Sequence, residues 1–170
     1  MSNKGSKCFD TEEVSGDSRV PFPPARSTPF RLPNSGKRVG LGVIMTSVLV
    51  TGGLGFMGSH FVRYLYENSL VGKIKVLDNY SYASDPKRLQ GLEVEVIKGD
   101  IRDVELLRSS TRGIDTLVNF AAETHNDNSI ERPGDFYDTN ANGVIAILQV
   151  AREKGFHLHQ VSTDEVFGDL

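Results

Sequence analysis

Several residue types that would point to particular folds or partners are scarce in this sequence. Its 170 residues include one cysteine, Cys8, and no tryptophan. A single cysteine excludes an intrachain disulfide and a cysteine-based metal site, and it suits a reducing cytoplasm. The net charge is −3, so there is no basic excess of the kind that binds nucleic acid. No apolar run is long enough to span a membrane, and we expect a cytoplasmic protein.

The first 44 residues differ from the rest in composition. Residues 1–38 hold five of the seven prolines and show no sustained apolar period. Residues 1–44 carry seven Lys or Arg and four Asp or Glu, which leaves the rest of the chain with a net charge of −6. Such a segment buries too little apolar surface to fold alone, so we expect a disordered tail. Because Met45 stands three residues before an apolar strand, an upstream extension from an early start is an alternative, and a functional tail is another.

A glycine cluster follows the first apolar strand, Val48 to Val50, and precedes a predicted helix. The cluster consists of four residues: Gly52, Gly53, Gly55 and Gly58. They fit both G-x-G-x-x-G and G-x-x-G-x-x-G, and either spacing leaves bare backbone where a pyrophosphate meets a helix N-terminus. A second strand, residues 73–77, ends in Asp78, where a carboxylate can bind the ribose hydroxyls of adenosine and repel a 2′-phosphate. The pattern predicts a site for NAD rather than NADP.

Alternation of strands and helices continues to the end of the chain. The remaining elements are predicted as strands at residues 93–97, 116–120 and 156–161, helices at residues 104–109 and 133–154, and a polar loop at residues 123–129. Asp103 is a suitable N-cap and Gly155 a suitable helix end. We therefore expect an α/β fold with a Rossmann-type doubly wound parallel sheet over residues 45–170, with strand 156–161 buried. Since such sheets usually have a sixth strand, we expect this one to be truncated after about five strands.

The loops at the carboxyl ends of parallel strands should meet at one rim of the sheet. There, Ala121 and Ala122 could let a cofactor lie close, or could simply pack a helix on the sheet. Asp100 could touch an adenine or form an ordinary turn. The neighbouring carboxylates Asp164 and Glu165 could cap a helix, bind a metal, or act as acid and base. Adjacent side chains point in different directions and no histidine set accompanies them, so a metal site is disfavoured.

These motifs together resemble the extended short-chain dehydrogenase/reductase superfamily. The resemblance rests on residues 51–60, 99–101, 120–125 and 162–168. Within the superfamily, Thr163-Asp164-Glu165 resembles the nucleoside-diphosphate-sugar 4,6-dehydratases, especially those acting on dTDP-glucose, since epimerases generally have small residues in place of the acidic pair. Plant-type UDP-glucose dehydratases share the Thr-Asp-Glu pattern, so the nucleotide stays open.

The resemblance implies a role for each of these residues. NAD would accept a hydride from C4 of the glucosyl unit and return it to C6. Glu165 would remove the C5 proton, Asp164 would protonate the departing C6 hydroxyl, and Thr163 would bind the C4 oxygen. Thr124 and Thr163 would contact the substrate, and no metal is implied. The implied cofactor residues are Gly52, Gly55, Phe56, Met57, Gly58, Asp78, Asn79, Tyr80, Ser81, Asp100, Ile101, Phe120, Ala121, Ala122, Glu123, Thr124 and Thr139.

The sequence departs from the family pattern in two places. Asn126 and Asn128 stand where the family usually has a valine and often an arginine. The superfamily's Tyr-x-x-x-Lys pair is absent, because none of the five tyrosines has a lysine four positions later. We therefore expect an N-terminal part, without the C-terminal substrate domain, that binds NAD weakly or not at all and turns nothing over.

The expected parent enzyme is a homodimer that dehydrates a nucleoside-diphosphate glucose to the 4-keto-6-deoxy sugar. The alternatives are another sugar-nucleotide epimerase, dehydratase or decarboxylase of the superfamily, and a non-catalytic NAD-binding module.

Overall fold

The fold was analysed in a computed structural model, which describes residues 46–163 and residue 166. The elements follow one another as β1 (Ser47–Thr51), α1 (Phe56–Glu67), β2 (Lys73–Asp78), the 3-10 helix η1 (Pro86–Leu89), β3 (Glu95–Lys98), α2 (Val104–Ser110), β4 (Thr116–Asn119), α3 (Asn126–Glu131), α4 (Pro133–Tyr137), the π-helix η2 (Asp138–Gly143), α5 (Val144–Lys154) and β5 (His157–Gln160). The predictions for residues 1–44 and for Asp164 and Glu165 fall outside the described residues.

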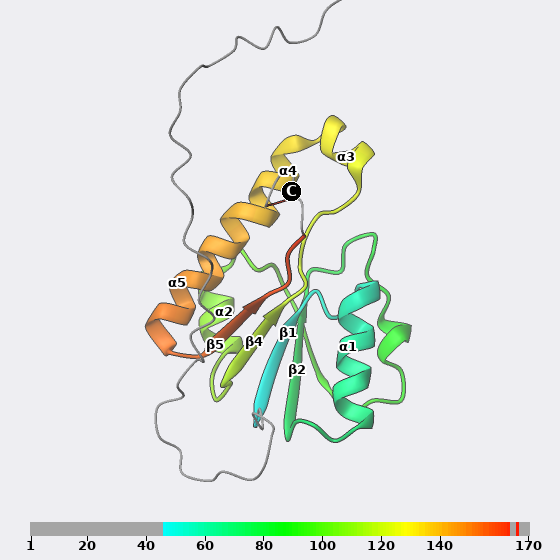
Figure 1. Ribbon diagram of the computed structural model, residues 1–170, viewed down its shortest axis with the longest axis vertical. Coiled ribbons are helices and arrows are strands. Elements are labelled where there is room, and N and C mark those ends of the chain that lie inside the picture. Colours follow the sequence, from blue (N-terminus) through cyan, green and yellow to red (C-terminus); the bar gives the residue numbers. More distant parts are fainter. Residues whose placement is uncertain (1–45, 164–165, 167–170) are drawn as a thin grey trace, which may run out of the picture. The chain divides into compact units, whose positions relative to one another are not determined.

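All five strands pair in parallel, in the order β3-β2-β1-β4-β5. In the centre of the sheet, Val50 of β1 pairs with Val76 on one side and Val118 on the other. The strand order reverses at β1, so the loops after β1 and β4 leave in opposite directions and open a crevice between them. The predicted Rossmann-type sheet is confirmed (Figure 1).

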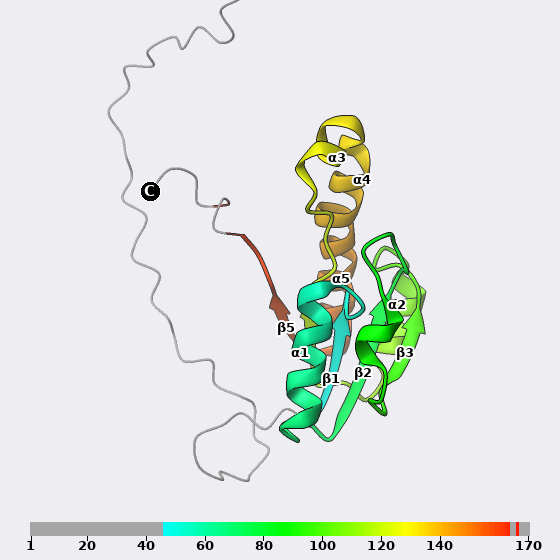
Figure 2. The same cartoon turned by 90° about the vertical axis from the view of Figure 1, so that its right-hand side faces the viewer.

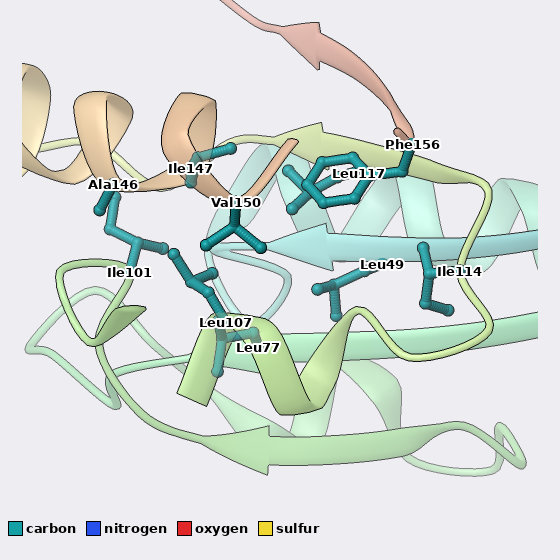
Figure 3. Packing of buried hydrophobic residues seen from close by; sticks show 10 residues of the cluster. All are labelled: Leu49, Leu77, Ile101, Leu107, Ile114, Leu117, Ala146, Ile147, Val150 and Phe156. Carbon is teal, nitrogen blue, oxygen red and sulfur yellow. The ribbon is translucent and has the colours of Figure 1, made fainter. Parts of the chain in front are cut away.

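Helices cover both faces of the sheet, and each face has its own apolar cluster. On one face Leu49 and Leu117 pack against Leu107 of α2 and against Ile147 and Val150 of α5 (Figure 3). The second cluster packs α1 and η1 on the other face. Successive residues of a strand point to opposite faces. This explains why every residue of β1 is buried and why its sequence is continuously apolar rather than alternating.

The last strand differs from its prediction. The sequence predicts a buried strand at residues 156–161, but β5 spans His157–Gln160 and is only half-buried to exposed. Within the described residues, β5 lies at one end of the sheet and pairs with β4 alone. Leu158 packs against the core while His159 and Gln160 are exposed. Its polar residues therefore fit an edge position, and Phe156, which is buried, precedes the strand.

Between β4 and β5 the structure confirms one prediction in its bounds and corrects another in part. The chain is helical throughout the predicted range from Pro133 to Lys154, with π-helical geometry in η2 between α4 and α5. The polar loop predicted for residues 123–129 was wrong in its second half, because it enters a short helix, α3, at Asn126. Neither feature has an apolar periodicity that the sequence could reveal. Together α3 and α4 rise beyond the carboxyl ends of the strands (Figures 1 and 2).

Local capping follows the prediction at both places where the sequence proposes it. The Asp103 side chain accepts a hydrogen bond from the Leu106 N–H at the start of α2. Gly155 ends α5 with φ of +77°, a conformation that glycine adopts without steric cost. These ends fix where α2 leaves the rim of the sheet and where α5 turns back into β5.

Candidate functional site

A pocket opens at the carboxyl ends of the strands, between the loops that follow β1, β2, β3 and β4. The empty space in it is about 540 Å³, which includes space open to solvent. Its lining consists of Gly52, Gly55, Leu77, Asp78, Asn79, Ser81, Ala83, Ser84, Gly99, Asp100, Ile101, Phe120, Ala121, Ala122, Glu123 and Thr139. This is the crevice in which open α/β sheets bind ligands.

The glycine turn forms the floor of this pocket through close backbone contacts. Gly52 has φ of +69°, and an added Cβ would lie 2.7 Å from the backbone nitrogen of Ala121. A Cβ on Gly58 would lie 2.3 Å from the Gly52 carbonyl oxygen. The turn therefore needs glycine where it passes β4 and where α1 begins. Gly55, the N-cap of α1, supplies no capping side chain, and N–H groups at such a helix start can bind an anion.

Asp78 joins the glycine turn to the loop after β2. Its side chain is buried, and Oδ2 accepts a hydrogen bond from the Leu54 N–H at 2.9 Å. Oδ1 accepts from the Tyr80 N–H at 2.9 Å and from the Ser84 hydroxyl at 2.5 Å. A carboxylate offers about four acceptor positions, so the contacts with described residues leave about one for a ligand hydroxyl. Asp78 thus holds the pocket together as well as facing it.

Asp100 lies across the pocket in a second anchored position. Arg102 donates to both of its carboxylate oxygens, through Nε at 2.9 Å and Nη2 at 2.7 Å. These hydrogen bonds from Arg102 lower the pKa of Asp100, against the opposing effect of its partial burial. The Arg102 guanidinium also lies 3.6 Å from the Asp138 carboxylate of η2. Asp100 is therefore ionised at neutral pH, and its loop is tied to η2.

The end of β4 is fixed by a buried polar side chain, Asn119. Its Oδ1 atom accepts hydrogen bonds from the Thr51 hydroxyl and from the Ala121 N–H, while its Nδ2 donates to Gln160 at 2.8 Å. One side chain thus links β1, β4 and β5 at their carboxyl ends. Ala121 packs against the core and also lines the pocket. The packing alternative is therefore confirmed for Ala121, while its contact with a cofactor stays a prediction.

A second amide, Asn140 of η2, holds the next stretch of the wall. Its Nδ2 donates to the Glu123 carbonyl at 2.8 Å, and its Oδ1 accepts from the Glu123 N–H at 2.9 Å. This pair of hydrogen bonds fixes the backbone of Glu123, which lies in the mostly exposed loop after β4. It also places the neighbouring Thr139 at the pocket.

The pocket gathers most of the cofactor residues that the resemblance implies. Those in its lining are Gly52, Gly55, Asp78, Asn79, Ser81, Asp100, Ile101, Phe120, Ala121, Ala122, Glu123 and Thr139. Their meeting at one rim agrees with the prediction, while their binding of a cofactor stays a prediction.

Other predicted residues lie outside this lining. Phe56 and Met57 are in the first turn of α1 and are 69% and 63% exposed. Gly58 is buried under the turn, and the Tyr80 ring lies 5.5 Å from the Lys98 ammonium. Thr124 is exposed beside Glu123.

The residues proposed for the reaction are placed only in part. Thr163 is exposed, three residues after β5. Asp164 and Glu165 fall outside the described residues, so their roles stay predictions. Within the described residues, no group of three or more His, Cys, Asp or Glu side chains could hold a metal ion.

Sequence reasoning missed several residues of this site. Ala83 and Ser84 line the pocket, and Asn140 and Arg102 hold its walls. Ser84 contacts Asp78 only through the fold of a loop, which no local pattern indicates. Asn140 lies in the helix predicted for residues 133–154, but no pattern in the sequence indicates its paired contact with Glu123.

Comparison with known proteins places this pocket in a family. A family model described as the NAD dependent epimerase/dehydratase family matches residues 48–170. The chain belongs to this family. The family's cofactor is therefore NAD, as the glycine turn and Asp78 indicate.

Named members of the epimerase/dehydratase family are similar to this chain. The dTDP-glucose 4,6-dehydratase of Mycobacterium tuberculosis is 41% identical over 125 residues, which are 72% of this chain and 38% of that protein. The crystal structure of DesIV, a dTDP-glucose 4,6-dehydratase from Streptomyces venezuelae with NAD and TYD bound, has a TM-score of 0.68 and 41% identity, and the match covers 73% of this chain and 41% of that one.

Epimerases of the family have nearly the same fold. A UDP-glucose-4-epimerase from Stenotrophomonas maltophila, with NAD and formylated UDP-arabinopyranose bound, has a TM-score of 0.67 and 28% identity over 74% of this chain and 39% of that one. The chain thus spans about two fifths of the length of these relatives. No helix in the described part is long and apolar enough to cross a membrane.

Proposed function

We propose that this chain supplies the cofactor-binding part of an NAD-dependent nucleoside-diphosphate-glucose 4,6-dehydratase, with dTDP-glucose as the favoured substrate. The observation that carries the proposal is the pocket at the strand ends, in which the glycine turn, Asp78 and Asp100 meet. The similarity to proteins named dTDP-glucose 4,6-dehydratase supports the choice of reaction. Residues 45–170 are the cofactor domain in this proposal.

The described residues fit NAD chemically. Gly52 and Gly58 allow the turn to pack tightly, and Gly55, which has no side chain, lines the pocket at the start of α1, where a diphosphate can approach the backbone. Asp78 keeps an acceptor position for a ribose hydroxyl, and its negative charge opposes a 2′-phosphate. Ile101 offers an apolar surface, and Asp100 an acceptor, to the adenine. Bound NAD would supply hydride transfer, accepting a hydride from C4 of the sugar and returning it to C6.

The chain's own residues would carry the proton transfers of the elimination. By resemblance, Glu165 removes the proton from C5 and Asp164 donates a proton to the C6 hydroxyl as it leaves. Thr163 would hydrogen-bond the oxygen on C4. The fold alone does not distinguish dehydration from epimerisation, because an epimerase is similar to this chain at a TM-score of 0.67. The acidic pair after Thr163 favours dehydration, because an epimerase has no leaving hydroxyl to protonate.

The cofactor assignment can be tested through the charge of Asp78. We expect the chain to bind NAD more tightly than NADP, and the substitution Asp78→Asn to reduce the ratio of the two affinities about tenfold, since it removes the repulsion of the 2′-phosphate. An NMR titration of each nucleotide measures the affinities even where binding is weak. The ratio is informative because any general loosening of the pocket affects both nucleotides alike.

Ser84→Ala is the matched control for Asp78→Asn. It removes one donor to the same carboxylate oxygen but keeps the charge, so the preference for NAD should persist. Of the two outcomes expected from the sequence, weak binding of NAD or none, the proposal takes weak binding. The absence of any saturable shift at the glycine turn would therefore contradict it, as would equal affinities of the unaltered chain for NAD and NADP.

A further inference from the structure

The peptide groups of Leu54, at the centre of the glycine turn, are held from two sides. The Leu54 N–H donates to Asp78 at 2.9 Å. The Leu54 carbonyl accepts from the Asp85 N–H at 3.0 Å and from Nη1 of Arg88 at 2.7 Å. Its side chain is buried in the cluster under α1. Leu54 is therefore the point at which the turn is anchored to the loop that follows β2.

Arg88 connects this point to another wall of the pocket. The same Nη1 atom donates to the Ala83 carbonyl at 2.8 Å, and Ala83 lines the pocket while Arg88 does not. One guanidinium nitrogen thus bridges the carbonyls of two loops. Hydrogen bonds from a charged donor are roughly twice as strong as those between neutral groups, so this bridge is the strongest link between the loops after β1 and β2 other than Asp78.

Arg88 is itself held rigidly on η1. Its carbonyl accepts from Nη2 of Arg63 on α1 at 2.7 Å, and Leu89, the next residue, is buried in the same cluster as Leu54. The Asp85 side chain caps η1 by accepting from the Lys87 N–H at 3.0 Å. The guanidinium is therefore presented from a short helix that is packed on the core and bonded to α1.

We propose that Arg88 is a positioning residue for the diphosphate-binding turn. By fixing the Leu54 carbonyl, it sets the orientation of the peptide between Leu54 and Gly55, whose N–H donates to the Gly52 carbonyl at 3.1 Å and so closes the turn at the start of α1. Arg88 acts through the turn and does not touch the ligand. This inference rests on the proposed function only in taking the ligand to be the diphosphate of NAD.

The variants Arg88→Met and Arg88→Lys test the bridge in the complete 170-residue chain. Methionine keeps much of the apolar stem and removes the donors, whereas lysine keeps one charged donor group. Arg112→Met is the matched control, because Arg112 is exposed just beyond the far end of α2 from the pocket. Circular dichroism identifies any variant that fails to fold. If Arg88→Met fails to fold, Arg88→Lys is used in its place.

Amide hydrogen exchange measures the turn without any ligand. In Arg88→Met we expect the Leu54 and Gly55 amides to exchange about tenfold faster, as expected for the loss of a charge-assisted hydrogen bond of about 1.4 kcal/mol. Amides in the middle of β1 should keep their rates. Arg88→Lys should recover part of the protection, and Arg112→Met should leave all of these rates unchanged. Unchanged exchange at Leu54 and Gly55 in Arg88→Met would overturn the positioning role.

An NMR titration with NAD then links the turn to the ligand. We expect the NAD dissociation constant to rise about tenfold in Arg88→Met, to recover partly in Arg88→Lys, and to stay constant in Arg112→Met. Faster exchange with unchanged NAD affinity would overturn the link to the cofactor. If the unaltered chain bound no NAD, the proposed function would fail, while the exchange rates would still decide whether Arg88 positions the turn.

Discussion

Single atoms decide how closely the first helix can approach the glycine turn. At Gly58 an added Cβ would lie 2.3 Å from the Gly52 carbonyl oxygen, a backbone atom that cannot rotate away. At Gly134 of α4 an added Cβ meets nothing within 4 Å. Replacing glycine by alanine should therefore be harmful at Gly58 and harmless at Gly134. Comparing the two positions separates the effect of close packing from the flexibility that every glycine gives the backbone.

We expect Gly58→Ala to destabilise the domain by about 1–3 kcal/mol, because the backbone must shift to admit the methyl group. The shift moves the start of α1, so NAD binding should weaken as well. Thermal unfolding and an NMR titration with NAD measure the two effects. Gly134→Ala should change the free energy of unfolding by less than about 1 kcal/mol and leave NAD binding intact. Equal stability of the two variants would contradict the packing argument.

The sequence predicted this motif but could not choose between its two spacings, which share Gly55 and Gly58. The structure separates the remaining two glycines. Gly52 has the positive φ and lies against the backbone of Phe120 and Ala121 just after β4, whereas a Cβ on Gly53 would meet the Val76 side chain. Only the fold brings β4 and Val76 to the turn, so the choice depends on contacts that are distant in sequence.

At the scale of elements, the sequence predicted all five strands to within two residues but not how deeply each of them is buried. β1, β2 and β4 lie inside the sheet, and their apolar residues agree with their burial. β3 and β5, at the two ends of the sheet within the described residues, carry exposed polar residues, so the burial predicted for residues 156–161 was wrong. The sequence predicted a helix across η2, but no local pattern indicated its π-helical geometry. Ser84 and Asn140 likewise join the site through contacts that no local sequence pattern indicates.

An exposed ion pair between two helices gives a pH dependence that can be measured. Arg108 of α2 donates to both carboxylate oxygens of Glu153 on α5, at 2.8 Å each. These hydrogen bonds lower the pKa of Glu153 from 4.5 to about 2. A carboxyl group whose pKa falls on folding stabilises the fold in its ionised form. Its contribution is complete above the unfolded pKa and is lost as the pH falls through the folded pKa.

We therefore expect Glu153→Gln to be less stable than the unaltered chain at about pH 6 and nearly as stable at about pH 2. Unfolding in urea across this range measures the difference, and an NMR titration of the Glu153 carboxyl gives its pKa directly. High salt should shrink the difference, because the pair is open to solvent. Glu131→Gln, which removes a carboxylate without an ion pair among the described residues, should show no such trend. A constant difference at all pH values would exclude the ion pair as its source.

At the scale of the whole molecule, the residues proposed to bind the cofactor and those proposed to carry out the reaction lie in different parts of the chain. The pocket is complete enough within the described residues to gather the loops after four strands. The proposed proton-transfer residues follow β5, which pairs within the described residues only with β4. The family's Tyr-x-x-x-Lys pair, which the resemblance assigns to oxidation at C4, has no counterpart among the five tyrosines. Binding and turnover should therefore be separable in this chain.

We expect the 170-residue chain, given NAD and dTDP-glucose, to form no 4-keto-6-deoxy sugar, because the Tyr-x-x-x-Lys pair to which the resemblance assigns removal of the C4 hydroxyl proton has no match in this sequence. Chromatography with mass spectrometry detects the product, and the Mycobacterium tuberculosis dehydratase assayed in parallel shows that the conditions support turnover. The absence of product should coexist with saturable NAD shifts at the glycine turn. Product formation by the chain alone would show that another group performs the first deprotonation, and Glu165→Gln would then test whether elimination still depends on the acidic pair.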